Sequence, residues 1–168
     1  MNAESSAQPV VSAEGASTRP ARPTRAGYVA WRTATTRWRD DDAYGHLNNA
    51  TYYELFDTAV NAHLYEATGL DIRALPQIGV VAETSCRYFR EIGFPEPVEM
   101  GLVVDRVGTS SVIYRIGLFQ GDSDEAAAEG RFVHVYVDNS GGSGARPVVP
   151  MPETIRSAVT ALLAVTPA

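Results

Sequence analysis

Apolar residues recur at spacings of three and four between residues 52 and 67, which predicts a long helix with a wide apolar face. The positions on that face are Tyr52, Leu55, Phe56, Ala59, Val60, His63, Leu64 and Ala67. Asn48, Asn49 and Thr51 are all suitable N-caps, so the pattern leaves the first helical residue open. Gly69 is well suited to end the helix. A face this wide predicts a helix that is covered on most of its sides.

Strand-like runs rich in β-branched and aromatic residues lie on both sides of this helix. One run precedes it, over residues 28–38, and the others follow, over residues 78–90, 98–107, 111–120 and 130–138. The connections after residue 90 contain glycine, proline and aspartate, and connections this short favour antiparallel neighbours. A last amphipathic helix is predicted over residues 153–164. We therefore expect an α+β fold, in which a curved antiparallel sheet of about five strands wraps one long central helix.

The first 25 residues differ in composition from the rest of the chain. They are rich in alanine, serine, proline and arginine and show no apolar periodicity, which is typical of a segment that cannot offset its ordering entropy. We expect a disordered tail over residues 1–25 and one domain over residues 26–168. Glu4 and Glu14 argue against a transit peptide.

Charge and cysteine content exclude several classes of function. The formal net charge of -6 argues against nucleic acid or an anionic membrane as the main partner. The single cysteine, Cys86, excludes an intrachain disulfide and is expected to be a small buried hydrophobe rather than a nucleophile. No apolar run approaches the ~20 residues that span a membrane, and the N-terminus lacks the apolar core of a secretory signal. These features together predict a cytoplasmic protein that does not enter a membrane.

The segment before the long helix carries the candidate chemistry. An acidic cluster, Asp40 to Asp42, is followed by Gly45, His46 and an amide pair at the helix start. The unpaired N–H groups and the dipole of a helix N-terminus favour negative charge, and they can also hold a developing oxyanion. A carboxylate next to a helix start could therefore act on an acyl carbonyl.

The run DDDAYGHLNNATYYELF closely resembles the signature of hotdog-fold acyl-CoA thioesterases of the 4-hydroxybenzoyl-CoA thioesterase type. That signature, D-x-D-x-x-G-H-x-N-N-x-x-Y, is matched by Asp40, Asp42, Gly45, His46, Asn48, Asn49 and Tyr52. The segments CRYFREIGFPEPVEMG, AEGRFVHVYVD and RPVVPMPE resemble later parts of the same family. The resemblance implies a hotdog fold, assembly into a homodimer or homotetramer, and hydrolysis of an acyl-CoA or acyl-carrier-protein thioester to the free acid and thiol.

The resemblance also implies roles for individual residues. It makes Asp42 the catalytic carboxylate, acting as nucleophile or general base, while the backbone amides near Asn49 and Ala50 polarise the thioester oxygen. His46 would assist or bind the pantetheine arm, and Gly45 would allow a close backbone approach. Asn49 stands where some relatives have a histidine or tyrosine, and its amide cannot shuttle a proton.

Substrate contacts are expected from aromatic and cationic residues. Tyr52, Tyr53 and Phe56 are expected to line the acyl pocket together with part of the strand over residues 78–88. Arg87 and Arg90 are candidates for the CoA phosphates. Strand alternation places these two arginines on opposite faces, so at most one of them should reach a given site.

No metal or redox cofactor is expected, and coenzyme A enters only as part of the substrate. His46, His63 and His134 lack the spacing of a zinc site, and we expect His63 and His134 to be hydrogen-bonded core residues. Two other functions remain open. One is a dehydratase or hydratase acting on acyl thioesters, with His46 as its proton-transfer group, and the other is a non-catalytic acyl-thioester binder.

Overall fold

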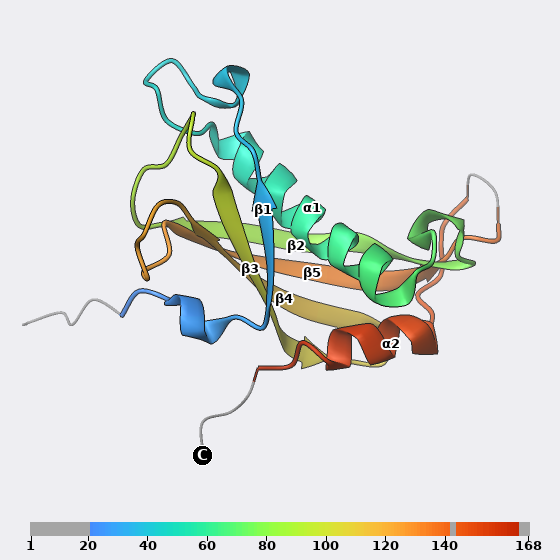
Figure 1. The fold of residues 1–168 in the computed structure, drawn as a ribbon. Coiled ribbons are helices and arrows are strands. Elements are labelled where there is room, and N and C mark those ends of the chain that lie inside the picture. The colour runs from blue at the N-terminus through green and yellow to red at the C-terminus, as the bar shows by residue number, and fades with distance from the viewer. Residues whose placement is uncertain (1–20, 142–143, 165–168) are drawn as a thin grey trace, which may run out of the picture.

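A computed structural model describes residues 21–141 and 144–164 and shows a long helix lying across one curved, five-stranded antiparallel sheet (Figure 1). The strands are β1 (Ala30–Ala34), β2 (Gln77–Tyr88), β3 (Val98–Val107), β4 (Ser111–Phe119) and β5 (Ala128–Asp138). Their order in the sheet is β1-β3-β4-β5-β2, and every neighbouring pair is antiparallel. This arrangement is the hotdog fold and confirms the predicted fold class.

The central helix α1 (Asn49–Thr68) begins and ends where capping chemistry places it. The Asn48 side chain accepts a hydrogen bond from the Ala50 amide, and Gly69 ends the helix in a left-handed conformation with φ 66°. Phe56 and Val60 are fully buried against the inner face of the sheet. A shorter helix, α2 (Glu153–Thr160), packs beside α1 (Figure 1). It ends four residues before the boundary predicted from the sequence.

The link between β2 and β3 does not form the short antiparallel connection that the sequence suggested. β2 pairs with β5 and β3 pairs with β1, so residues 89–97 cross from one part of the sheet to another. This link contacts the loop before α1, because the Leu47 amide donates to the Ile92 carbonyl at 2.7 Å. The crossing therefore brings the loop before α1 together with the end of β2.

The first described residues pack against the sheet. Thr24 forms a β-bridge with Glu125, and the Pro23 carbonyl accepts a hydrogen bond from the Ala126 amide. The packed part of the chain therefore begins before the predicted boundary at residue 26, while the predicted tail over residues 1–20 lies outside the described residues. Within the part of the chain that the structure describes, no helix is long and apolar enough to cross a membrane.

Candidate active site

A buried carboxylate anchors the loop that leads into α1. The 3-10 turn Trp38–Asp40 follows β1, and the Asp40 carboxylate accepts hydrogen bonds from the Arg37 amide at 2.8 Å and from the Arg37 guanidinium at 3.0 Å. These hydrogen bonds from Arg37 hold the pKa of Asp40 below its usual range. The Asp40 carbonyl also accepts from the Asn48 amide at 2.8 Å. Asp40 therefore has a structural role, which is to fix the loop against the start of the helix.

Asp42 lies in a tight turn that holds one of its two carboxylate oxygens. Its Oδ1 accepts hydrogen bonds from the amides of Tyr44 at 2.8 Å and His46 at 3.3 Å. Gly45 adopts φ 80°, a left-handed conformation that glycine takes without steric cost. Oδ2 makes no hydrogen bond with the described residues. The turn therefore orients the carboxylate and leaves one oxygen available to a ligand.

The first turn of α1 offers one amide next to this carboxylate. The Ala50 amide, which the sequence analysis offered to the substrate, already donates to the Asn48 side chain at 2.9 Å. The Thr51 amide donates to the Asn48 carbonyl. The Asn49 amide makes no hydrogen bond with any residue that the structure describes. Asn49 therefore provides the backbone donor at the helix start, and the expectation for Ala50 is corrected.

Asp42 and the start of α1 open onto a cavity of about 360 Å³. Its lining residues are Asp42, His46, Leu47, Asn49, Tyr52, Tyr88, Phe89, Arg90 and Glu91. The cavity is of the size usual for small-molecule sites. The sequence-predicted residues Asp42, His46, Asn49, Tyr52 and Arg90 therefore lie together.

Two side-chain contacts join residues that line this cavity. His46 Nε2 lies 3.1 Å from a carboxylate oxygen of Glu91, on the link that follows β2. The rings of Tyr52 and Tyr88 meet edge to face, with centroids 4.9 Å apart. Burial raises the pKa of Tyr52 to about 12, so its hydroxyl stays protonated at neutral pH. The cavity thus combines a carboxylate, an imidazole with an acidic neighbour, and an aromatic wall.

Two residues predicted to bind substrate have other positions. Phe56 is fully buried and packs against Gly130, where an added Cβ would lie 2.4 Å from its ring. Arg87 lines a different surface pocket, with Glu129 and Arg131, and its guanidinium lies 5.3 Å from the ring centroid of Phe89, which itself lines the Asp42 cavity. Phe56 therefore belongs to the core, and Arg87 does not reach the cavity.

Two others lie close to the cavity without being free in it. Tyr53 packs edge-on against Phe56 and does not line the cavity. Arg90 does line it, but its guanidinium also donates to the Gln120 carbonyl at 2.6 Å. Of the two predicted arginines, only Arg90 thus lines the cavity with Asp42, and because it lies beyond the end of β2, strand alternation does not account for its position.

Sequence reasoning missed Leu47, Phe89 and Glu91 as cavity residues, whereas Tyr88 lies in the strand segment that it assigned to the acyl pocket. Phe89 and Glu91 belong to the β2–β3 link, which is fixed by hydrogen bonds from the Phe94 amide to the Asp41 carboxylate and from the Gln120 side chain to the Gly93 carbonyl. Glu91 was visible in the sequence directly after Arg90, but its pairing with His46 depends on the crossing of the chain.

Cys86 is half-buried on β2, and burial raises the pKa of its thiol to about 11, as suits a packing residue. No cluster of metal-ligating side chains occurs among the described residues.

The model of the family described as the thioesterase-like superfamily matches residues 36–159, a span that holds the whole cavity. The chain belongs to this superfamily. A solved structure from Pseudomonas aeruginosa strain PAO1 is 46% identical to it, covers 86% of this chain and 98% of its own length, and has a TM-score of 0.80. No curated protein matches.

Two further solved structures carry the name thioesterase. One, also from Pseudomonas aeruginosa, is 28% identical, covers 77% of this chain and 96% of its own, and has a TM-score of 0.68. The other, from Thermus thermophilus, is complexed with coenzyme A and zinc. It is 26% identical, covers 81% of this chain and 95% of its own, and has a TM-score of 0.66. Membership in the superfamily and these relatives support thioester hydrolysis as the general activity.

Proposed function

We propose that this protein hydrolyses acyl-CoA thioesters, with Asp42 as the catalytic carboxylate. The observation that carries the proposal is that Asp42 and Asn49 both line one cavity. The turn holds Oδ1 of Asp42, which leaves Oδ2 to act, and the Asn49 amide, at the positive end of α1, has no hydrogen-bond partner among the described residues. A relative that binds coenzyme A supports CoA rather than a carrier protein as the thiol.

Hydrolysis requires the thioester carbon beside Asp42 and its oxygen at the Asn49 amide. Oδ2 of Asp42 either takes a proton from water that attacks the carbon or attacks the carbon itself. In both routes the carbonyl oxygen becomes negative, and the helix-end amide stabilises it. The C–S bond then breaks, and coenzyme A leaves as the thiol after gaining a proton. In both routes, water supplies the second carboxyl oxygen of the free acid.

The same proposal includes a homodimer paired along β2. This strand has twelve residues and lies at the edge of the sheet, where its outer side has no partner among the described residues. Val81 is 46% exposed and Tyr88 47% exposed. A long edge strand with exposed apolar side chains favours pairing with a second copy. Such pairing would cover Tyr88, which lines the Asp42 cavity, so the dimer would complete one wall of the site.

The test is thiol release from acetyl-, hexanoyl-, palmitoyl- and benzoyl-CoA by the wild type and by Asp42→Asn. Asp57→Asn is the matched control, because Asp57 is exposed on α1 and does not line the cavity. We expect Asp42→Asn to lower kcat/KM by ~100-fold or more, or about 2.7 kcal/mol of barrier, while the control keeps the wild-type rate. Wild-type turnover by Asp42→Asn, or no turnover of any of these substrates, contradicts the proposal.

The His46–Glu91 contact favours a second candidate function. A dehydratase or hydratase acting on acyl thioesters needs a histidine with an acidic partner, and this pair lies in the same cavity as Asp42. It predicts that His46→Ala abolishes hydration of an enoyl-CoA while Asp42→Asn leaves it intact. Thioester hydrolysis that survives in His46→Ala, with no hydration by the wild type, rules this candidate out.

A further inference from the structure

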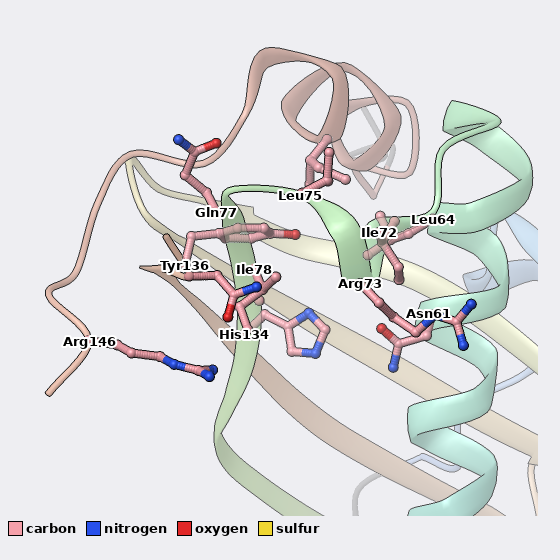
Figure 2. Close-up of a pocket in the computed structure, with 13 residues that line it drawn as sticks. Asn61, Leu64, Ile72, Arg73, Leu75, Gln77, Ile78, His134, Tyr136 and Arg146 are labelled. Atoms are coloured by element: carbon pink, nitrogen blue, oxygen red, sulfur yellow. The ribbon is translucent and has the colours of Figure 1, made fainter. Parts of the chain in front are cut away.

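A second cavity, of about 280 Å³, lies at the other end of α1 (Figure 2). Asn61 and Leu64 of α1 form one side, and His134 and Tyr136 of β5 form the opposite side. Asn61 is twelve residues beyond Asn49, which places it about 18 Å along the helix from the candidate active site. None of the residues that line this cavity also lines the Asp42 cavity. The second cavity is therefore a separate place in the protomer.

His134 is the unusual residue in this cavity. It is 2% exposed, and its Nδ1 is buried without a hydrogen-bond partner among the described residues, which corrects the expectation of a hydrogen-bonded core histidine. Burial lowers the pKa of His134 to about 4, so the ring is neutral at pH 7. A Cβ on Gly79 would lie 2.9 Å from this Nδ1, so β2 approaches the ring only because residue 79 is glycine. A buried polar atom without a partner is costly in a folded protein, and a ligand that bonds to it would remove that cost.

The rest of the lining combines apolar walls with positive charge at the rim. Leu64, Ile72 and Ile155 provide apolar surface. The charged residues of the lining are both arginines, Arg73 and Arg146. Arg73 forms an ion pair with Asp71, and its Nε lies 2.8 Å from the Asp71 carboxylate. Arg146 forms no ion pair with the described residues, and its side chain extends toward His134 (Figure 2).

From these features we propose that the second cavity binds a small carboxylic acid with an apolar or aromatic body. Arg146 at the rim pairs with the carboxylate, the aliphatic walls hold the body, and a hydroxyl on the far end of the acid bonds to His134. Arginine suits a carboxylate because its planar fork can donate two parallel hydrogen bonds. The neutral imidazole can accept a hydrogen bond from a hydroxyl or donate one to it.

Calorimetric titration and amide chemical shifts test the proposal with 4-hydroxybenzoate, benzoate and the uncharged benzamide as probes. We expect saturable binding of 4-hydroxybenzoate at about 1 mM or below, weaker binding of benzoate, and no saturation by benzamide. The amides of Gly79 and Asn61 should shift, and those of the Asp42 turn should not. Binding is measured without turnover, so the result is independent of whether the protein hydrolyses thioesters.

Variants identify the groups responsible. Arg146→Gln should weaken binding of both acids by about tenfold or more, and Arg106→Gln, which removes an exposed charge outside the cavity, should not. His134→Phe should reduce the affinity for 4-hydroxybenzoate to that for benzoate. His63→Phe should leave it unchanged, because Nε2 of His63 is also buried and unpartnered but lies outside the cavity.

Several results would overturn the proposal. These are no saturation by either acid up to about 10 mM, equal binding of benzamide, a full effect of Arg106→Gln, or an ordered water alone on His134 in a structure grown with the acid. If the acid competes with thioester turnover and shifts the amides of the Asp42 turn, it binds at the active site as product, and the proposal fails. If it binds without competing and shifts the amides of Gly79 and Asn61, the second cavity is a separate acid site, as proposed.

Discussion

Replacing His134 by phenylalanine should flatten the pH dependence of stability between pH 8 and pH 5. Burial lowers the pKa of this histidine in the folded protein to about 4, from an ordinary value of 6.5. Between these two values the unfolded chain binds a proton that the folded protein does not. Stability is therefore greatest above pH 6.5 and falls as the pH decreases toward 4.

The magnitude follows from the size of the pKa difference. One pKa unit corresponds to about 1.36 kcal/mol, so the full effect of His134 is about 3.4 kcal/mol. At pH 5 most but not all of the unfolded chains carry the proton, and the linkage relation then gives a loss of about 2 kcal/mol relative to pH 8. Because the side chain is 2% exposed, solvent screening does not reduce this value much.

The assay is urea denaturation of the wild type and of His134→Phe at pH 8, 7, 6 and 5. Between pH 8 and pH 5, the free energy of unfolding should decrease by about 2 kcal/mol more in the wild type than in His134→Phe. Carboxylates titrate in both proteins, so their contribution cancels in this comparison. Tyr136→Phe is the control, because the pKa of Tyr136 is raised to about 12 and its hydroxyl does not titrate in this range. Parallel curves for the wild type and His134→Phe would show that His134 is not the source of the pH dependence.

Three other substitutions test the fold and the candidate active site. Gly45→Ala introduces a side chain at φ 80°, so it should cost about 1–2 kcal/mol in the denaturation assay and lower thioesterase activity, whereas equal activity and stability would contradict the role of this turn. Gly130→Ala places a Cβ 2.4 Å from Phe56 and should lower unfolding free energy by about 1–3 kcal/mol, whereas Gly27→Ala, with nothing within 4 Å, should not. Val81→Lys puts a charge on the exposed edge strand, so light scattering should show a monomer for this variant and the proposed dimer for the wild type; a dimeric variant would argue against pairing along β2.

Local sequence signals were sufficient for most of the elements. The spacing of apolar residues and Gly69 predicted α1 and its C-terminal end, because capping and helical periodicity are properties of neighbouring residues, and the structure selects Asn48 among the three candidate N-caps. The strand predictions were less accurate at their ends. The run over residues 28–38 shortens to β1 (Ala30–Ala34), because the hydrogen bonds between Arg37 and Asp40 turn the chain before the α1 loop.

The order of the strands could not be obtained in this way. Short connections favour neighbouring strands, yet the link over residues 89–97 crosses the sheet because β2 finds its partner in β5. The Leu47–Ile92 and Asp41–Phe94 hydrogen bonds that fix this link join residues far apart in the sequence. No local pattern contains that information.

The order of residues along the chain was enough to establish the long capped helix, the acidic turn before it and the family to which these belong. Which side chains share a cavity became clear from the folded chain: Arg90 rather than Arg87 lies beside Asp42, and Phe56 is core. The folded chain also shows that His134, which the pattern made an ordinary core residue, has a buried nitrogen without a partner among the described residues. The physical reason is that periodicity and capping depend on residues within one or two turns, whereas burial and hydrogen-bond satisfaction depend on which distant strands meet.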